Sequence, residues 1–262
     1  MDGRVDPARI ARVARELADP DVCCFQEVAV NFAALAGSSG EDQIELLARG
    51  FPGYSAHFGC AVDLPDDGNG RRRYGNLILS RLPVLRVLRH SLPWPPEGGV
   101  PSMPRIAIEA VVDAPWGPVG VTTTHLEAYS VKQRAAQAER LREFRLEAAA
   151  HAQARASERE TSAVFDPSRR AATSVLAGDF NMPPEDPIVG RLLETWRDAW
   201  QIAHPDLPHP PSFHVHDKES GIAPYCCDFV FVSEDLAARV AAVRMDLETQ
   251  ASDHQPVVVD FR

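Results

Sequence analysis

The most informative stretch of this chain is Leu176-Ala177-Gly178-Asp179-Phe180-Asn181. It directly follows an apolar segment, Thr173 to Leu176, which we predict to be a buried strand. Side chains at i and i+2 of an extended chain point the same way, so Asp179 and Asn181 face one site while Phe180 turns into the core. Such an oxygen-bearing pair at a strand end suits a hard divalent cation, or the water that attacks a phosphorus atom.

Composition indicates one soluble α/β domain. The chain has 262 residues, of which 45 % are hydrophobic and 24 % charged, and its formal net charge is −10. A dedicated nucleic-acid binder usually carries a basic face that displaces phosphate counterions. The one compact basic run, Arg71-Arg72-Arg73, is interpreted as a solvated loop. The charge therefore argues against a large polynucleotide as substrate.

The cysteine spacing and the apolar runs indicate the cellular compartment of the protein. The five cysteines include two adjacent pairs and no C-x-x-C spacing, which fits neither a disulfide framework nor a zinc site. We interpret Cys23-Cys24 and Cys226-Cys227 as small, reduced core residues. No segment approaches the roughly 18 to 20 apolar residues of a membrane span, and Met1 to Asp6 lacks an apolar signal-peptide core. We expect a cytoplasmic protein without a transmembrane segment.

Hydrophobic periodicity predicts several strands that follow one another, with few long helices between them. This order favours a mixed sheet or two packed sheets over a regular βαβ barrel. Predicted helices cover Pro7–Leu17, Glu41–Ala48, Val131–Glu160 and Pro187–Leu193. Predicted strands cover Asp21–Phe25, Tyr54–Cys60, Gly75–Leu79, Arg105–Asp113, Val119–Thr124, Thr173–Leu176, Cys227–Val232 and Val257–Phe261.

Polar side chains stand at or beside the ends of these strands. Charged groups embedded in apolar strands are costly to bury unless they are paired or bind a metal. Gathered at one edge of a sheet sandwich, they would form a carboxylate and imidazole cluster able to hold Mg²⁺ and activate water. The residues concerned are Glu27, His125, Asp179, Asn181, Asp228, Asp253 and His254.

An ordered series of short motifs resembles the endonuclease/exonuclease/phosphatase superfamily, whose members include deoxyribonuclease I. Any one motif is weak evidence, but six in the order of the family are strong, and they cover residues 7 to 262. They are Gln26-Glu27, Gly75-Asn76 with Ser80-Arg81, Thr124-His125-Leu126, Gly178-Asp179-Phe180-Asn181, Asp228-Phe229-Val230-Phe231-Val232-Ser233 and Ser252-Asp253-His254.

The resemblance implies an α/β fold in four layers, with two packed mixed β-sheets flanked by helices, as a single domain over residues 1–262. Members of the family usually begin with a core strand that ends in an Asn near the phosphate. This chain starts within the loop that follows such a strand. Either the true start lies upstream, or this form lacks an inner strand. We expect the chain as given to be less stable and less active than one extended upstream.

The resemblance also implies the metal and water sites. Glu27 would be the principal ligand of Mg²⁺ or Mn²⁺, and Asp253 would support the metal. Asp179 would orient or deprotonate the attacking water, and Asn181 would hydrogen-bond the phosphate. The reaction implied is in-line attack of water on a phosphoester.

The remaining candidate residues would position the reacting groups or surround the site. His254, oriented by Asp228, would stabilise the pentacovalent phosphorus or act as acid or base. His125 would face the leaving group or serve as a core histidine. Asn76 would buttress the site or be purely structural. Arg105 could reach a substrate phosphate or form a salt bridge. His214 and His216 suggest a second metal, but the neighbouring prolines favour a substrate-side loop.

Together these observations predict a Mg²⁺-dependent phosphoesterase, acting as a monomer. The acidic charge favours a small phosphoester or a phospholipid headgroup, and a nuclease on short or single-stranded nucleic acid is the alternative. A non-catalytic binding protein that retains the fold is a third hypothesis. It predicts loss of a metal ligand or of the catalytic histidine, yet Glu27, Asp179 and His254 are all present.

Overall fold

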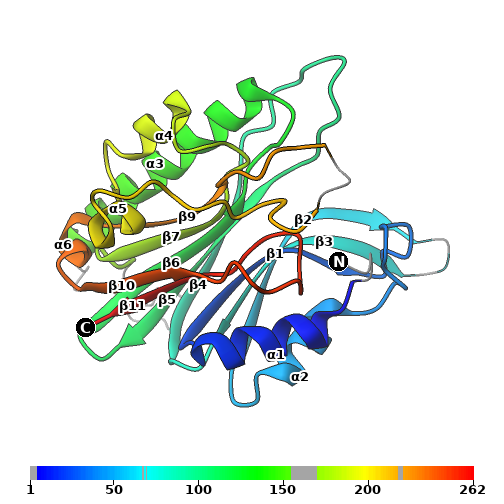
Figure 1. The fold of residues 1–262 in the computed structure, drawn as a ribbon, viewed down its shortest axis with the longest axis horizontal. Helices are drawn as coiled ribbons and strands as arrows, with labels where there is room; N and C mark the ends of the chain where they lie inside the picture. Colours follow the sequence, from blue (N-terminus) through cyan, green and yellow to red (C-terminus); the bar gives the residue numbers. More distant parts are fainter. Residues whose placement is uncertain (1–4, 67, 69, 155–169, 218–220) are drawn as a thin grey trace, which may run out of the picture.

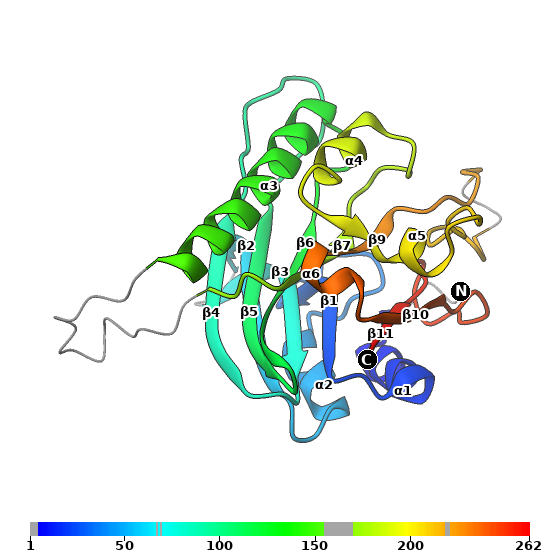
Figure 2. The same cartoon turned by 90° about the vertical axis from the view of Figure 1, so that its left-hand side faces the viewer.

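The computed structural model describes residues 5–66, 68, 70–154, 170–217 and 221–262 of the chain. Two β-sheets pack against each other. Helices α3 (Val131–Gln153) and α4 (Pro187–Leu192) lie on the outside of one sheet, and helices α1 (Pro7–Ala18) and α2 (Gln43–Gly50) on the outside of the other (Figure 1 and Figure 2). The predicted four-layer α/β fold is confirmed.

The larger sheet has six strands in the order β4-β5-β6-β7-β9-β8. Strands β6 and β7 are parallel, whereas the other neighbours in this sheet are antiparallel. The parallel pair is the one that connects through α3, as a parallel crossover requires. The strands are β4 Val84–Ser91, β5 Ile106–Ala114, β6 Gly117–His125, β7 Ser174–Asp179, β8 Arg197–Asp198 and β9 Asp228–Val232.

The smaller sheet is antiparallel, with the order β1-β3-β2, and a separate two-stranded sheet pairs β10 with β11. The described residues thus form three sheets rather than the two expected from the sequence. The basic run Arg71–Arg73 lies in β3, not in a loop, because it pairs with β2 beyond the turn. The strands are β1 Val22–Val30, β2 Ser55–Pro65, β3 Arg71–Ser80, β10 Val240–Met245 and β11 Val257–Phe261.

Helices α1 to α5 begin at side-chain caps. At the start of α3 the Ser130 hydroxyl accepts a hydrogen bond from the backbone N–H of Gln133 at 3.0 Å. This helix ends at Gln153 rather than at the predicted Glu160, and residues 155–169 lie outside the described part of the chain. The helices are α1 Pro7–Ala18, α2 Gln43–Gly50, α3 Val131–Gln153, α4 Pro187–Leu192, α5 Ala199–Ala203 and α6 Glu234–Ala237.

Three apolar clusters separate the four layers. Leu77 and Leu79 of β3 belong to the cluster that includes residues of α1 and α2, while Ile78 belongs to the cluster between the two sheets. This alternation follows from the two-residue period of a strand. A third cluster joins Phe144 of α3 to Leu176 of β7. The layers place the ends of β6, β7 and β9 beside the middle of β1, which is where the site forms.

No helix in the described residues is both long and apolar enough to cross a lipid bilayer. All five cysteines are free, and Cys23, Cys226 and Cys227 are buried. This agrees with their interpretation as small, reduced core residues.

Candidate active site

Three polar residues stand in a row at the ends of adjacent strands of the larger sheet. His125 is the last residue of β6, Asp179 is the last residue of β7 and Asp228 is the first residue of β9. The register pairs Asp179 with His125 on one side and with Asp228 on the other. Strand order therefore brings together residues that lie far apart in the sequence.

Gly178 makes the close approach of β6 and β7 feasible. Its φ is 152°, and a Cβ atom added there would lie 2.0 Å from the carbonyl oxygen of Thr124. Only a residue without a side chain fits this position. The glycine thereby allows Asp179 to lie directly beside the end of β6.

The carboxylate of Asp179 lies between two imidazole rings. Its Oδ2 atom is 3.4 Å from Nε2 of His125 and 3.8 Å from Nε2 of His254, while Oδ1 accepts the backbone N–H of Asn181 at 2.8 Å. Burial, and then the charge of Asp228, raise the pKa of Asp179 to about 7. A carboxylate with this pKa can take a proton from water near neutral pH.

His254 is held by Asp228. Its Nδ1 atom lies 2.8 Å from Oδ2 of Asp228, and the same oxygen accepts a hydrogen bond from the hydroxyl of Ser212 at 2.6 Å. Burial alone would lower the pKa of His254, but the hydrogen bond with Asp228 and the nearby carboxylates outweigh it and raise the pKa to about 10. The ring is therefore an imidazolium at neutral pH.

Glu27 comes from the smaller sheet. The prediction that it follows the end of a strand is wrong, because β1 continues past it and pairs with β3 on both sides of a bulge between Phe25 and Val28. Glu27 has a φ of 59°, in the left-handed region that L residues rarely adopt. Bulges next to active sites redirect side chains, and this one projects Glu27 toward the larger sheet. Beside it, the amide of Gln26 donates to the Thr123 hydroxyl at 2.8 Å.

His125 lies between Glu27 and Asp179. Its Nδ1 atom is 3.7 Å from Oε1 of Glu27. Within the described residues this buried nitrogen has no hydrogen-bond partner. Burial, followed by the positive charges of Arg105 and His254, lowers the pKa of His125 well below its ordinary value. This imidazole is neutral, so it can donate one hydrogen bond and accept another but adds no charge.

The donor set around Glu27 fits a hard cation. Its side chain is 60 % exposed, so a ligand can reach it. The surrounding protein raises the pKa of Glu27, mainly by partial desolvation; the charge of His254 opposes this rise, and the like charge of Asp253 adds to it. Two carboxylates that repel each other at an open position are typical of a Mg²⁺ or Mn²⁺ site.

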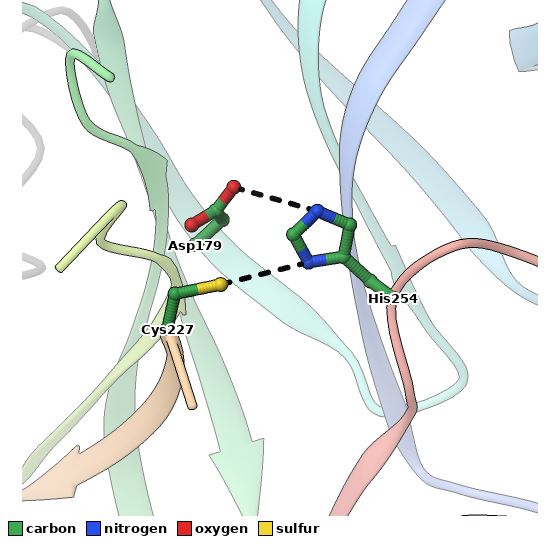
Figure 3. Close-up of side chains that lie close together, drawn as sticks. All are labelled: Asp179, Cys227 and His254. Carbon is green, nitrogen blue, oxygen red and sulfur yellow. Dashed lines mark hydrogen bonds and ion pairs between the residues drawn. The ribbon is translucent and has the colours of Figure 1, made fainter. Parts of the chain in front are cut away.

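A second group of possible ligands lies deeper. Asp179, Cys227 and His254 bring ligand atoms within 4.8 Å of one another. Figure 3 shows these three side chains directed toward one another. The Sγ atom of Cys227 is 4.0 Å from Nδ1 of His254. Burial, then the charge of Asp228, raise the pKa of this thiol far above neutrality. Because the thiol stays protonated and Asp228 already occupies Nδ1, these residues suit a hard cation less well than Glu27 does.

The remaining predicted residues surround this centre. The amide of Asn181 donates to the carbonyl of Leu126 at 2.9 Å, which fixes the residue beside Asp179. The buried Asn76 donates to the carbonyl of Ile106 at 2.9 Å and so ties β3 to the start of β5. This contact links the two sheets.

Arg105 is 6 % exposed and donates from Nε to Oε2 of Glu127 at 3.4 Å, which is the salt bridge considered from the sequence. Its Nη1 atom is buried without a hydrogen-bond partner in the described residues. Its positive charge also acts on Glu27 and His125. One end of the guanidinium group is thus anchored, and the other retains donors for an anion.

His214 and His216 do not come together as metal ligands. Nδ1 of His214 is 3.2 Å from Oδ2 of Asp217, and Nε2 of His216 is 2.8 Å from the carbonyl of Leu247. The segment nevertheless adjoins the site, because the ring of Phe213 lies 4.4 Å from the ring of His254. This agrees with the loop interpretation.

Sequence reasoning missed two neighbours of Asp228. Ser212 accepts the backbone N–H groups of Cys227 and Asp228, both at 3.0 Å, while it donates to the Asp228 carboxylate. Cys227 was interpreted only as a core residue, yet its thiol lies 3.5 Å from Oδ2 of Asp228. Ser212 follows a proline-rich segment, and no local pattern indicates its contact with a strand that begins sixteen residues later.

Comparison with protein families agrees with this geometry. Residues 3–254 match the model of the Endonuclease/Exonuclease/phosphatase family. The chain belongs to this family. Membership supports a hydrolase that acts on phosphoesters. No curated protein matches the sequence.

Solved structures with the same fold include three enzymes of different description. A mannosyl-6-phosphatase from Bacteroides thetaiotaomicron has a TM-score of 0.65 at 17 % identity, over 98 % of this chain and 90 % of that one. A 3′ phosphatase from Neisseria, bound to product DNA hairpin, has 0.62 at 20 %, over 99 % and 96 %. The human nocturnin catalytic domain has 0.61 at 18 %, over 97 % and 85 %. At these identities the likeness concerns the fold.

Proposed function

We propose that this protein is a divalent-metal-dependent phosphoesterase that hydrolyses a phosphodiester or phosphomonoester by in-line attack of water. The observation that carries the proposal is the position of the Asp179 carboxylate between a neutral imidazole, His125, and an imidazolium, His254. A base, a neutral hydrogen-bonding group and a positive charge thus converge on one point. Phosphoryl transfer needs this combination of positioning and charge stabilisation.

Each side chain has a task in this reaction. Asp179 orients the attacking water and accepts its proton, which its pKa of about 7 permits. His254, kept protonated by Asp228, stabilises the negative charge on the phosphoryl oxygens or supplies a proton. His125 hydrogen-bonds the leaving-group side. Asn181 has one amide N–H bound to the Leu126 carbonyl, and its other N–H is suited to a phosphate oxygen.

Glu27 and Asp253 would hold Mg²⁺ or Mn²⁺. When bound, the cation neutralises the charge on the phosphoryl oxygens. The free donors of Arg105 give this chain a second positive group near the same charge. Asn76 supports both by holding β3 against the start of β5.

The substrate class follows from charge. With a net charge of −10, the chain lacks the overall positive field that attracts polynucleotides. We therefore favour a small phosphoester or a phospholipid headgroup. A nuclease on short or single-stranded nucleic acid is the alternative outcome of a substrate screen.

The experiment compares the wild-type chain with Asp179→Asn and His254→Ala, using p-nitrophenyl phosphate and bis-p-nitrophenyl phosphate with Mg²⁺, Mn²⁺ or EDTA. We expect metal-dependent release of p-nitrophenol, with kcat about 10²–10⁴-fold lower in each variant. Asp63→Asn on β2, whose partner Arg71 lies on the adjacent β3, is the control and should behave as wild type. Folding of every variant is checked by circular dichroism. A folded wild-type chain that hydrolyses neither ester with any metal would leave a non-catalytic binding protein as the explanation.

A further inference from the structure

A cavity of about 750 Å³ opens next to the candidate active site. Three parts of the chain form its walls: the segment after β7, helix α5 with the loop that follows it, and the segment before β9. The side chains that line it include Glu185, Gln201, Leu207, His209 and Tyr225. None of these residues has a role in the hydrolysis proposed above.

Tyr225 connects this cavity to His254. Its ring lies 5.7 Å from the ring of Phe213, which also lies 4.4 Å from the ring of His254. The backbone carbonyl of Tyr225 also accepts the N–H groups of Ser212 and Phe213. One aromatic ring therefore separates the cavity wall from the imidazolium that faces the phosphate. The cavity therefore adjoins the His254 side of the candidate active site.

A buried hydrogen-bonded pair forms part of the wall. Nε2 of His209 lies 2.8 Å from Oδ2 of Asp198, and the two side chains are 7 % and 3 % exposed. Oδ1 of Asp198 also caps α5 by accepting the N–H of Trp200 at 2.8 Å. The His209 ring is fixed in this way, and its Nδ1 atom remains for a further hydrogen bond. Rigid placement of a polar group on a cavity wall is typical of a site that selects a ligand by hydrogen bonding.

The charge of the lining restricts what can enter. Among the described residues that line the cavity there is neither lysine nor arginine, while Glu185 is acidic. A second phosphate on the substrate would meet a negative charge and no cation. The lining instead combines hydrogen-bonding groups of Gln201 and His209 with the apolar surfaces of Leu207 and Tyr225. The hydroxyl-bearing edges and C–H faces of a sugar or polyol match such a surface.

We propose that this cavity receives the alcohol part of the phosphoester substrate, and that this alcohol is uncharged and carries several hydroxyl groups, as in a sugar or polyol. The proposal rests on the proposed function, since it extends the same site. It predicts selection for substrates whose only phosphate is the one hydrolysed.

The test uses two series of esters. The monoesters are phenyl phosphate, glucose 6-phosphate and glucose 1,6-bisphosphate. The diesters are the p-nitrophenyl phosphate esters of methanol, of glucose through its 6-oxygen, and of the same sugar bearing a 1-phosphate. Each series contains a small alcohol, a larger uncharged hydroxylated alcohol, and that alcohol with one more phosphate. In the series that the wild-type chain hydrolyses, we expect the second member, the ester of the larger uncharged hydroxylated alcohol, to have the highest kcat/KM.

Leu207→Trp tests whether the cavity is used. The indole ring should fill it and lower kcat/KM for the second member by about tenfold or more, while the small ester changes less than about twofold. Leu64→Trp is the matched control, because this exposed leucine lies on β2, away from the cavity. Equal effects of Leu207→Trp on small and large esters, or no effect on either, would overturn the proposal.

Gln201→Lys tests whether the charge of the cavity lining disfavours a second phosphate on the substrate. An added ammonium in the wall should raise the kcat/KM of the bisphosphorylated substrate relative to its monophosphorylated partner by about fivefold. Gln153→Lys at the far end of α3 makes the same change in net charge and should leave this ratio unchanged. A ratio that Gln201→Lys does not alter contradicts the proposal.

Failure of the proposed function can be distinguished from failure of the cavity proposal. If the folded wild-type chain hydrolyses no member of either series, the proposed function is wrong. If it hydrolyses a series but prefers the smallest or the most charged member, the phosphoesterase stands and the cavity proposal is wrong.

Discussion

The Nδ1 atom of His254 lies 2.8 Å from Oδ2 of Asp228, which joins the loop before β11 to the first residue of β9. Ser212 adds a third segment by donating to the same oxygen. The carboxylate thus fixes the ring and keeps it charged, leaving Nε2 directed toward Asp179 at 3.8 Å. The protonation state of the site depends on this contact.

Asp228→Asn should therefore lower kcat without removing any group that touches the substrate. An amide can still hydrogen-bond the ring but no longer supplies the negative charge, and loss of a partner of this kind typically costs about 10–100-fold. Steady-state kinetics on bis-p-nitrophenyl phosphate, or on whichever ester is hydrolysed, measure the effect. His254→Ala should cost more than Asp228→Asn, and the double variant should be no worse than His254→Ala. Independent, additive losses would show that Asp228 does not act through His254.

Glu27→Gln should weaken metal binding. Removing the charge of a carboxylate from a hard-cation site lowers affinity, here by at least about tenfold. Titration with Mn²⁺ followed by electron paramagnetic resonance measures binding without reference to activity. Glu45→Gln on the exposed face of α2 is the control. Unchanged Mn²⁺ affinity in Glu27→Gln would move the metal site elsewhere, with Asp179, Cys227 and His254 as the next group to test.

Gly178→Ala should destabilise the fold next to the site. The added methyl group would lie 2.0 Å from the Thr124 carbonyl oxygen, so β6 and β7 must separate. Overpacking of this kind costs about 1–3 kcal/mol in the free energy of unfolding. Gly190→Ala in α4 is the matched control: its Cβ meets nothing within 4 Å, and alanine favours helix by up to about 1 kcal/mol. Urea denaturation of both variants compares them. Equal stability of the two would contradict the close approach of the strands.

Stability at acid pH should depend on Glu109. Burial would raise the pKa of this carboxylate, but hydrogen bonds from His90 and Arg170 outweigh burial and lower the pKa below 4.5. A lowered pKa in the folded state contributes stability that is present above the unfolded value and is lost as pH falls through the folded value. The wild-type free energy of unfolding should therefore decrease as pH falls below about 4.5.

Glu109→Gln removes the nearer carboxylate partner of Arg170, whose Nη2 lies 2.5 Å from Oε2 of Glu109, and leaves Glu147 at 3.6 Å from Nη1. Breaking a buried pair costs up to about 3–5 kcal/mol, and less where a second carboxylate remains, and the acid-dependent loss should become smaller. Chemical denaturation between pH 3 and 7 follows both effects. Glu143→Gln, at an exposed pair with Arg140, should change the free energy of unfolding by less than about 1 kcal/mol. An acid dependence identical in wild type and Glu109→Gln would exclude Glu109 as its source.

Local patterns in the sequence were enough for most elements and for the identity of the polar residues. The apolar run before Asp179 is β7, and the predicted strands Arg105–Asp113 and Val119–Thr124 are the antiparallel pair β5 and β6. Strands β4 and β10 escaped prediction. A loop was predicted at Arg71–Arg73 because the segment is not hydrophobic. Pairing with β2 holds it extended instead.

By itself the sequence predicted which polar residues lie at or near the ends of strands, because periodicity and strand ends are properties of neighbouring residues. Only the tertiary structure decided the orientation, the contacts and the protonation of these residues. The bulge that turns Glu27, the approach of Ser212 to Asp228 and the charge on His254 each depend on segments distant in the chain. Register and packing bring such segments within hydrogen-bond distance, and desolvation with neighbouring charges then sets each pKa. No local pattern contains that information.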